Sequence, residues 1–93
     1  MDGYFQLIQS ILAQQKLVLG EQIAMDLARR VAQIQFDASG RLTGVSDGFD
    51  ALKNLIEQYR GLLGPAAESF AKDAARDVLK EHPELRVPEV LQI

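Results

Sequence analysis

The sequence has 93 residues and no cysteine, which leaves room for one domain over residues 1–93 and excludes disulfides and thiolate metal sites. Its net charge is −3, from 10 basic and 13 acidic residues, and no basic run is longer than Arg29-Arg30, which disfavours nucleic acid as a partner. No apolar stretch is long enough for a membrane span or a signal peptide, so we expect a soluble, cytoplasmic protein without a membrane partner.

The first third of the chain predicts two helices. Apolar residues recur at helical spacing through about residue 19, from Tyr4 and Ile8 to Leu19. Gly20 interrupts this pattern, and the steps of four, four and three from Ile23 to Ile34 predict a second helix over about 21–33. We favour a corner at Gly20, while a kink in one long helix stays open as the alternative.

The pattern then changes to the alternation of a strand. Ile34, Phe36 and Leu42 alternate with polar residues around the segment Asp37-Ala38-Ser39-Gly40. An aspartate that opens a turn and a glycine that closes it are typical of a hairpin, because aspartate bonds its own backbone and glycine accepts a positive φ. A short β-hairpin is therefore predicted over 34–45.

Two more helices and an apolar tail complete the chain. Ser46 or Asp47 is expected to cap a third helix, whose stripe runs from Phe49 to Leu63. Gly64-Pro65 ends it and begins a fourth, alanine-rich helix that runs to about Glu81. Pro83 stops the fourth helix, since the residue before a proline avoids helical geometry. The tail over 83–93 is apolar enough that we expect it to dock on protein.

The two helix pairs resemble each other. A shift of 44 residues aligns 8–20 with 52–64 and pairs Gly20 with Gly64, while a shift of 47 aligns 23–31 with 70–78, with five identical residues in nine. The alternative explanation for this similarity is that any two amphipathic helices of similar composition can be aligned to some degree. We favour an internal duplication because both units share a Leu-Gly hinge.

Residues with catalytic or metal-binding chemistry are sparse. His82 has no second histidine or cysteine nearby to complete a metal set and is expected to cap a helix or face solvent. Asp73, Asp77 and Glu81 share a helix with Lys72, Arg76 and Lys80, which is typical of a solvated face. We therefore expect no catalytic residue, no metal site and no cofactor, and do not expect an enzyme.

One segment resembles a known type of module. Leu62-Leu63-Gly64-Pro65-Ala66-Ala67, followed by Phe70-Ala71, is similar to the Leu-x-Gly-Pro-apolar-Ala run of small helical accessory modules of bacterial kinases and response regulators. The biochemical role of these modules is unknown. The resemblance implies a helical domain in bacterial signalling, and it implies no functional residue.

These observations predict a mainly α fold, with two tandem αα-hairpins joined by a short β-hairpin and followed by an extended C-terminal tail. The first helix pair spans 1–33, the hairpin 34–45, the second pair 46–82 and the tail 83–93. An isolated two-stranded hairpin is marginal in water, and the tail is apolar, so we expect both to pack across a homodimer or against another protein. The candidate contact residues are Phe36, Leu42, Val45, Leu85, Val87, Val90, Leu91 and Ile93.

The leading hypothesis is thus a protein–protein interaction or dimerisation module. The alternative is a helical domain that binds a small apolar ligand between the helix pairs. Its lining would be aromatic residues, although apolar side chains at helical spacing more often form an ordinary core: Tyr4, Phe5, Phe49, Tyr59 and Phe70. A helix-turn-helix DNA reader is a weaker alternative, supported only by the corner at Gly20 and by Arg29-Arg30.

Overall fold

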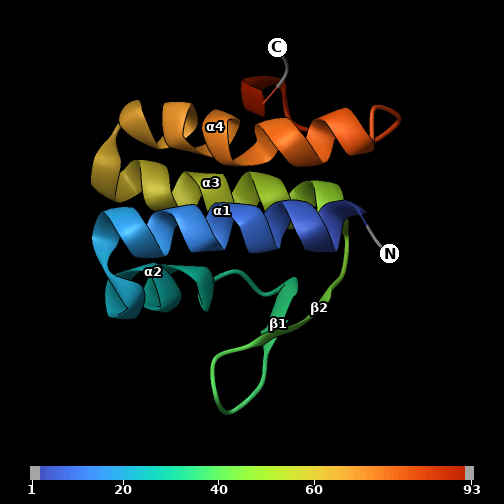
Figure 1. Ribbon diagram of the computed structural model, residues 1–93. Helices are drawn as coiled ribbons and strands as arrows, with labels where there is room; N and C mark the ends of the chain where they lie inside the picture. Colours follow the sequence, from blue (N-terminus) through green and yellow to red (C-terminus); the bar gives the residue numbers. More distant parts are fainter. Residues whose placement is uncertain (1–2, 92–93) are drawn as a thin grey trace.

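The computed structural model describes residues 3–91, and in this part of the chain it has four α-helices and one two-stranded antiparallel sheet (Figure 1). The mainly helical fold with a small sheet is confirmed. The elements are α1 (Gly3–Leu19), α2 (Glu21–Ala28), β1 (Ile34–Phe36), β2 (Leu42–Val45), α3 (Gly48–Leu63) and α4 (Ala66–Glu81), with a 3₁₀ turn at Glu89–Leu91.

A glycine ends the first helix of each pair: Gly20 alone separates α1 from α2, and Gly64-Pro65 separates α3 from α4. Gly20 has φ +86° and Gly64 has φ +65°, a backbone region that favours glycine, and no atom lies within 4 Å of the position a Cβ would take at either residue. The amide of Gly20 donates to the carbonyl of Lys16 at 3.0 Å, and that of Gly64 to the carbonyl of Arg60 at 2.8 Å. The corner favoured at Gly20 is therefore present. Figure 1 shows both corners at the left end of the molecule, which we call the corner end.

The helices pack around one shared core. Helix α1 contacts α2, α3 and α4, and α3 contacts α2 and α4 as well. The inner face of α4 consists of Ala67, Ala71 and Ala75, whose small side chains let another helix approach closely. Positions related by the 44-residue shift are buried in both α1 and α3: Leu7 and Ala51, Ile8 and Leu52, Ile11 and Leu55, Leu12 and Ile56, Gln15 and Tyr59.

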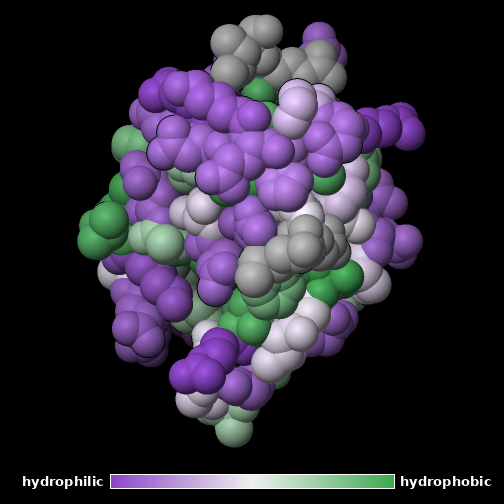
Figure 2. Space-filling model, turned by 45° about the vertical axis from the view of Figure 1, so that its right-hand side comes forward, coloured by the Kyte–Doolittle hydropathy of each residue, from purple (hydrophilic) through white to green (hydrophobic). Residues whose placement is uncertain are grey.

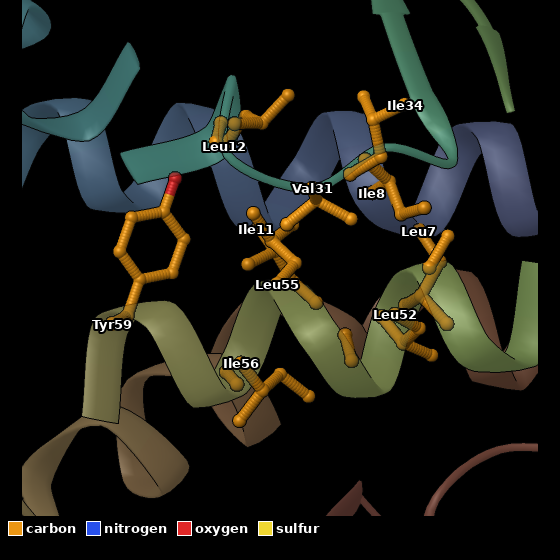
Figure 3. Packing of buried hydrophobic residues seen from close by; sticks show 14 of the residues in the cluster. Leu7, Ile8, Ile11, Leu12, Val31, Ile34, Leu52, Leu55, Ile56 and Tyr59 are labelled. Carbon is orange, nitrogen blue, oxygen red and sulfur yellow. The ribbon is translucent and has the colours of Figure 1, made fainter. Parts of the chain in front are cut away.

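Tyr59 is the largest fully buried side chain. Its hydroxyl donates to the carbonyl of Ala24 at 3.1 Å, and Figure 3 shows the ring reaching from α3 toward α2. Burial raises the pKa of Tyr59 because the phenolate would lose its hydration. The hydrogen bond satisfies the phenol inside the core and joins α3 to α2.

The second helix is shorter than the apolar spacing predicts. It ends at Ala28, not near residue 33, and the chain continues through turns in which the amide of Val31 donates to the carbonyl of Ala28 at 3.1 Å. Val31 and Ile34 are nevertheless buried. Their spacing fits a helix, but a turn and a strand bring them to the same core, so the periodicity overestimated the helix.

The hairpin forms where the sequence predicts it. Ile34 pairs with Val45 and Phe36 with Leu42, with a bulge between Gln35 and Phe36. Asp37 Oδ1 accepts hydrogen bonds from the Ser39 hydroxyl at 2.7 Å and from the amides of Ser39 and Arg41 at 2.9 Å each. These bonds, the hydroxyl above all, lower the pKa of Asp37. Gly40 has φ +85°, as a turn-closing glycine should.

The start of α3 departs from the expected capping. The helix begins at Gly48 after Asp47, which has φ +46° and makes no side-chain hydrogen bond to the helix. The Ser46 hydroxyl instead donates to the Gln33 carbonyl at 3.4 Å. Asp47 thus occupies the N-cap position, as one of the two expected residues, and its carbonyl accepts the Ala51 amide at 2.8 Å. The side-chain cap expected from Ser46 or Asp47 is absent, because Ser46 faces back to the hairpin and Asp47 has left-handed backbone geometry.

The tail folds back over its own chain. Its Val87 and Leu91 side chains are buried in the core cluster. The Tyr4 hydroxyl donates to the Arg86 carbonyl, and the Arg86 guanidinium lies 4.9 Å from the centre of the Phe49 ring. These contacts join the start of α1, the start of α3 and the tail. Residues 89–91 form a 3₁₀ turn, so this part of the tail is not extended.

Candidate interaction surface

The structure places most of the predicted contact residues against their own chain. Leu42, Val87 and Leu91 are buried, and Phe36, Val45 and Leu85 are half-buried against the same core. Ile93 and the side chain of Val90 lie outside the described residues. The side chains of the hairpin and tail that the structure describes therefore do not form an exposed apolar surface for a docking partner.

The exposed large apolar side chains occur near the corners instead. Leu17 is 85% exposed, Val18 39%, Ile23 48% and Leu62 55%. Leu17 and Val18 lie in the last turn of α1, Ile23 lies in the first turn of α2, and Leu62 lies in the last turn of α3. We call these four residues the corner patch. Figure 2 shows hydrophobic side chains at the left-hand edge, with others lower on the same face, beneath a hydrophilic upper part.

A groove between α2 and α3 extends from this patch. It has a volume of about 650 Å³, and Ile23, Leu27 and Leu62 form its apolar part. Gly61 also lines it, and no atom lies within 4 Å of where a Cβ at this residue would be. Its polar part consists of Asp26, Arg30, Glu57 and Gln58. The groove is thus an open hollow beside exposed aliphatic side chains.

The corner end carries charges of both signs. Arg60 near the end of α3 lies 3.5 Å from Glu68 in the first turn of α4, and the Arg60 side chain is the more exposed of the two. Lys16 in the last turn of α1 and Glu21 in the first turn of α2 occupy the corresponding positions in the other helix pair. Two cations and two carboxylates thus lie next to the corners, and the adjoining groove adds one cation, Arg30, and two carboxylates, Asp26 and Glu57.

Gln15 adds an unusual feature close to the same end. It is fully buried on α1, and neither its Nε2 nor its Oε1 has a hydrogen-bond partner in the described part of the protein. An unsatisfied buried amide destabilises a fold. The last turns of α1 thus bury a polar side chain and expose Leu17 and Val18. Departures from ordinary patterning of this kind occur preferentially at functional sites.

The remaining candidates show no comparable site. His82 follows the last residue of α4, and its Nε2 lies 3.3 Å from Gln6 Oε1. The six alternating charges from Lys72 to Glu81 are exposed, and the upper part of Figure 2 shows this hydrophilic face. Within residues 3–91 there is no cluster of side chains that could hold a metal ion. No helix of that range has both the length and the apolar character that crossing a bilayer requires.

The proposed aromatic lining is dispersed. Tyr59 is in the core, whereas Phe49 lies beneath Arg86 and lines a groove between α3 and the tail. Phe5 and Phe70 are half-buried, and the Tyr4 ring covers Gly48. The five residues thus have different surroundings.

Sequence reasoning missed the corner patch because it assigned Val18, Ile23 and Leu62 to core stripes and gave Leu17 no role. The run Leu17-Val18-Leu19 contained the relevant signal. Successive residues of a helix point about 100° apart, so three consecutive apolar side chains cannot all face one core.

Comparison of the chain with protein-family models, curated proteins and solved structures finds no match. The resemblance of the Gly64-Pro65 corner to helical accessory modules of bacterial kinases and response regulators therefore stays a prediction.

Proposed function

We propose that this chain is a protein–protein interaction module of bacterial signalling or regulation, and that it binds its partner through the corner patch. The observation that carries the proposal is the exposure of Leu17, Val18, Ile23 and Leu62 around the corners. Covering an exposed leucine of this kind contributes about 1.5–3 kcal/mol. A contiguous exposed apolar surface with a polar rim is typical of a contact site.

The burial of matching positions in α1 and α3 supports a further part of the proposal. We infer that the chain arose by duplication of one αα-hairpin, with the β-hairpin as the join. Leu12 and Ile56 are equivalent and buried, and Val18 and Leu62 are equivalent and exposed. A duplicated unit presents equivalent side chains at one end, which accounts for an apolar patch made from both helix pairs.

A photo-crosslinking amino acid at Leu17 tests the interaction in the cells that produce the protein. A discrete adduct is expected from this position. The matched control is the same amino acid at Lys72, which is exposed on the outer face of α4. The absence of any adduct specific to position 17 would refute the proposal.

A small apolar ligand is the second candidate. A groove of about 350 Å³ between α4 and the tail is lined by Leu79, Leu85, Val87 and Leu91, which favours an apolar guest. Native mass spectrometry of the purified chain is the test. A bound lipid-like species that disappears in Leu79→Asp would support this alternative, and a mass equal to that of the bare chain would count against it.

A further inference from the structure

We propose that the partner of the corner patch is a second copy of this chain, held by reciprocal insertion of Leu17 into the groove beside Gly61 of the other copy. This inference rests on the proposed interaction function and specifies its partner. The two copies are related by a two-fold axis through the corner end.

Shape is the first reason for choosing a second copy. Leu17 protrudes with 85% of its surface exposed, and the groove at Gly61 is open. The 44-residue shift makes positions 17 and 61 equivalent, so one helix pair carries a protruding side chain where the other carries a hollow. In a two-fold interface, a contact between residue i of one copy and residue j of the other is repeated with the copies exchanged. One protrusion and one hollow per chain are therefore enough to form two identical contacts.

Charge is the second reason. The net charge of −3 disfavours close approach of two copies in general, but the corner end carries Lys16 and Arg60 against Glu21 and Glu68. A strongly basic or acidic partner would meet like charges at this surface of mixed charge. With the groove included, the surface carries three cations and four carboxylates, so an identical surface can place each cation opposite a carboxylate.

The groove provides a further pair of complementary charges. Arg30 and Glu57 line it together with a second carboxylate, Asp26, and within residues 3–91 none of these three side chains makes an ion pair. In the two-fold arrangement the groove of each copy receives the end of α1 from the other. Arg30 and Glu57 then form a polar rim around the inserted Leu17, as is usual around an apolar contact.

Sedimentation equilibrium of the full chain from about 1 to about 500 µM tests the proposal. An interface limited to one end of a small domain belongs to the weak class, so we expect a reversible dimer with Kd on the order of 10 µM. Leu17→Glu and Gly61→Leu are each expected to weaken the dimer at least about tenfold, the first by charging the protrusion and the second by filling the hollow. Both positions are exposed helical sites, and circular dichroism verifies that the variants fold.

Gln9→Glu is the matched control, because it places the same charge on an exposed position of α1 away from the corner end. Its dimer constant should stay within about twofold of the wild type. A wild type that remains monomeric at every concentration would overturn self-association. A dimer whose Kd is unchanged by Leu17→Glu would overturn the proposed interface. The crosslink at Leu17 separates the two proposals. An adduct with a different protein would preserve the interaction function while removing the second copy as partner.

Discussion

The contact between Gly48 and Tyr4 offers the sharpest test of the packing. A Cβ added at Gly48 would lie 2.3 Å from both Cγ and Cδ2 of Tyr4 and 2.8 Å from its Cβ. These atoms are close to the backbone of α1 and cannot move away as the end of a flexible side chain would. Gly48→Ala therefore has to displace the start of α1 or the start of α3.

Overpacking of this kind destabilises a protein by about 1–3 kcal/mol. Gly61→Ala is the matched comparison within the same helix, because no atom lies within 4 Å of its added Cβ. It should stabilise the fold by about 0.5–1 kcal/mol, since alanine restricts the unfolded chain more than glycine does. The two variants are thus expected to differ by about 1.5–4 kcal/mol, and each kcal/mol corresponds to about 4–8 °C in Tm.

Urea unfolding followed by far-ultraviolet circular dichroism measures the difference, at protein concentrations low enough to keep the chain monomeric. Adding Tyr4→Ala to Gly48→Ala removes the ring and should abolish most of the penalty, which a double-mutant cycle quantifies. Equal stability of Gly48→Ala and the wild type would show that the ring does not cover Gly48 as described.

Four further changes test other parts of the structure. Gln15→Met should raise the free energy of unfolding by about 1–3 kcal/mol, because it removes an unsatisfied buried amide, whereas exposed Gln9→Met should change it by less than about 0.5 kcal/mol in urea titrations. Tyr59→Phe should lower stability by about 1–3 kcal/mol at neutral pH, since the Ala24 carbonyl loses its donor. Because burial raises the Tyr59 pKa, the wild type retains its full advantage below the unfolded value of about 10 and loses up to about 1.4 kcal/mol per pH unit above it. The stability gap to Tyr59→Phe should therefore narrow as the pH rises above about 10. The pKa of Asp37, measured by NMR, should lie below the ordinary aspartate value of 3.8. Its stabilisation of the turn is present above that value and lost as the pH falls through the folded pKa, and Asp37→Ala should speed amide exchange at Ser39 and Arg41. Leu91→Ala should cost about 2–5 kcal/mol in thermal unfolding if the tail belongs to the core, and a stability unchanged by this substitution would contradict its docking.

Local chemistry was sufficient to predict much of the fold. Gly20 and Gly64 end helices because of their backbone freedom, and Asp37 with Gly40 specifies the hairpin turn. Tertiary packing overrode the local signal elsewhere. The spacing of Val31 and Ile34 continued a helical pattern beyond Ala28, although these residues reach the core from a turn and a strand.

The candidate surface was harder to predict than the fold. A helical stripe specifies which side chains are apolar, but neighbouring helices decide which flank of the stripe is covered. Leu62 continues the apolar stripe of α3, and Ile23 belongs to that of α2. Both side chains nevertheless stay exposed, because no neighbouring helix covers them. Leu91 shows the opposite outcome, since an apolar tail can dock on its own chain as readily as on a partner.

The contact between Tyr4 and Arg86 has a consequence for synthesis of the protein. The two residues are 82 positions apart, so a growing chain cannot form this contact until nearly all of the described residues have left the ribosome. A chain that stops before Arg86 lacks Val87 and Leu91 as well and leaves the core surface they cover open to water. Such incomplete chains are expected to be preferred substrates for the proteases that remove unfolded proteins.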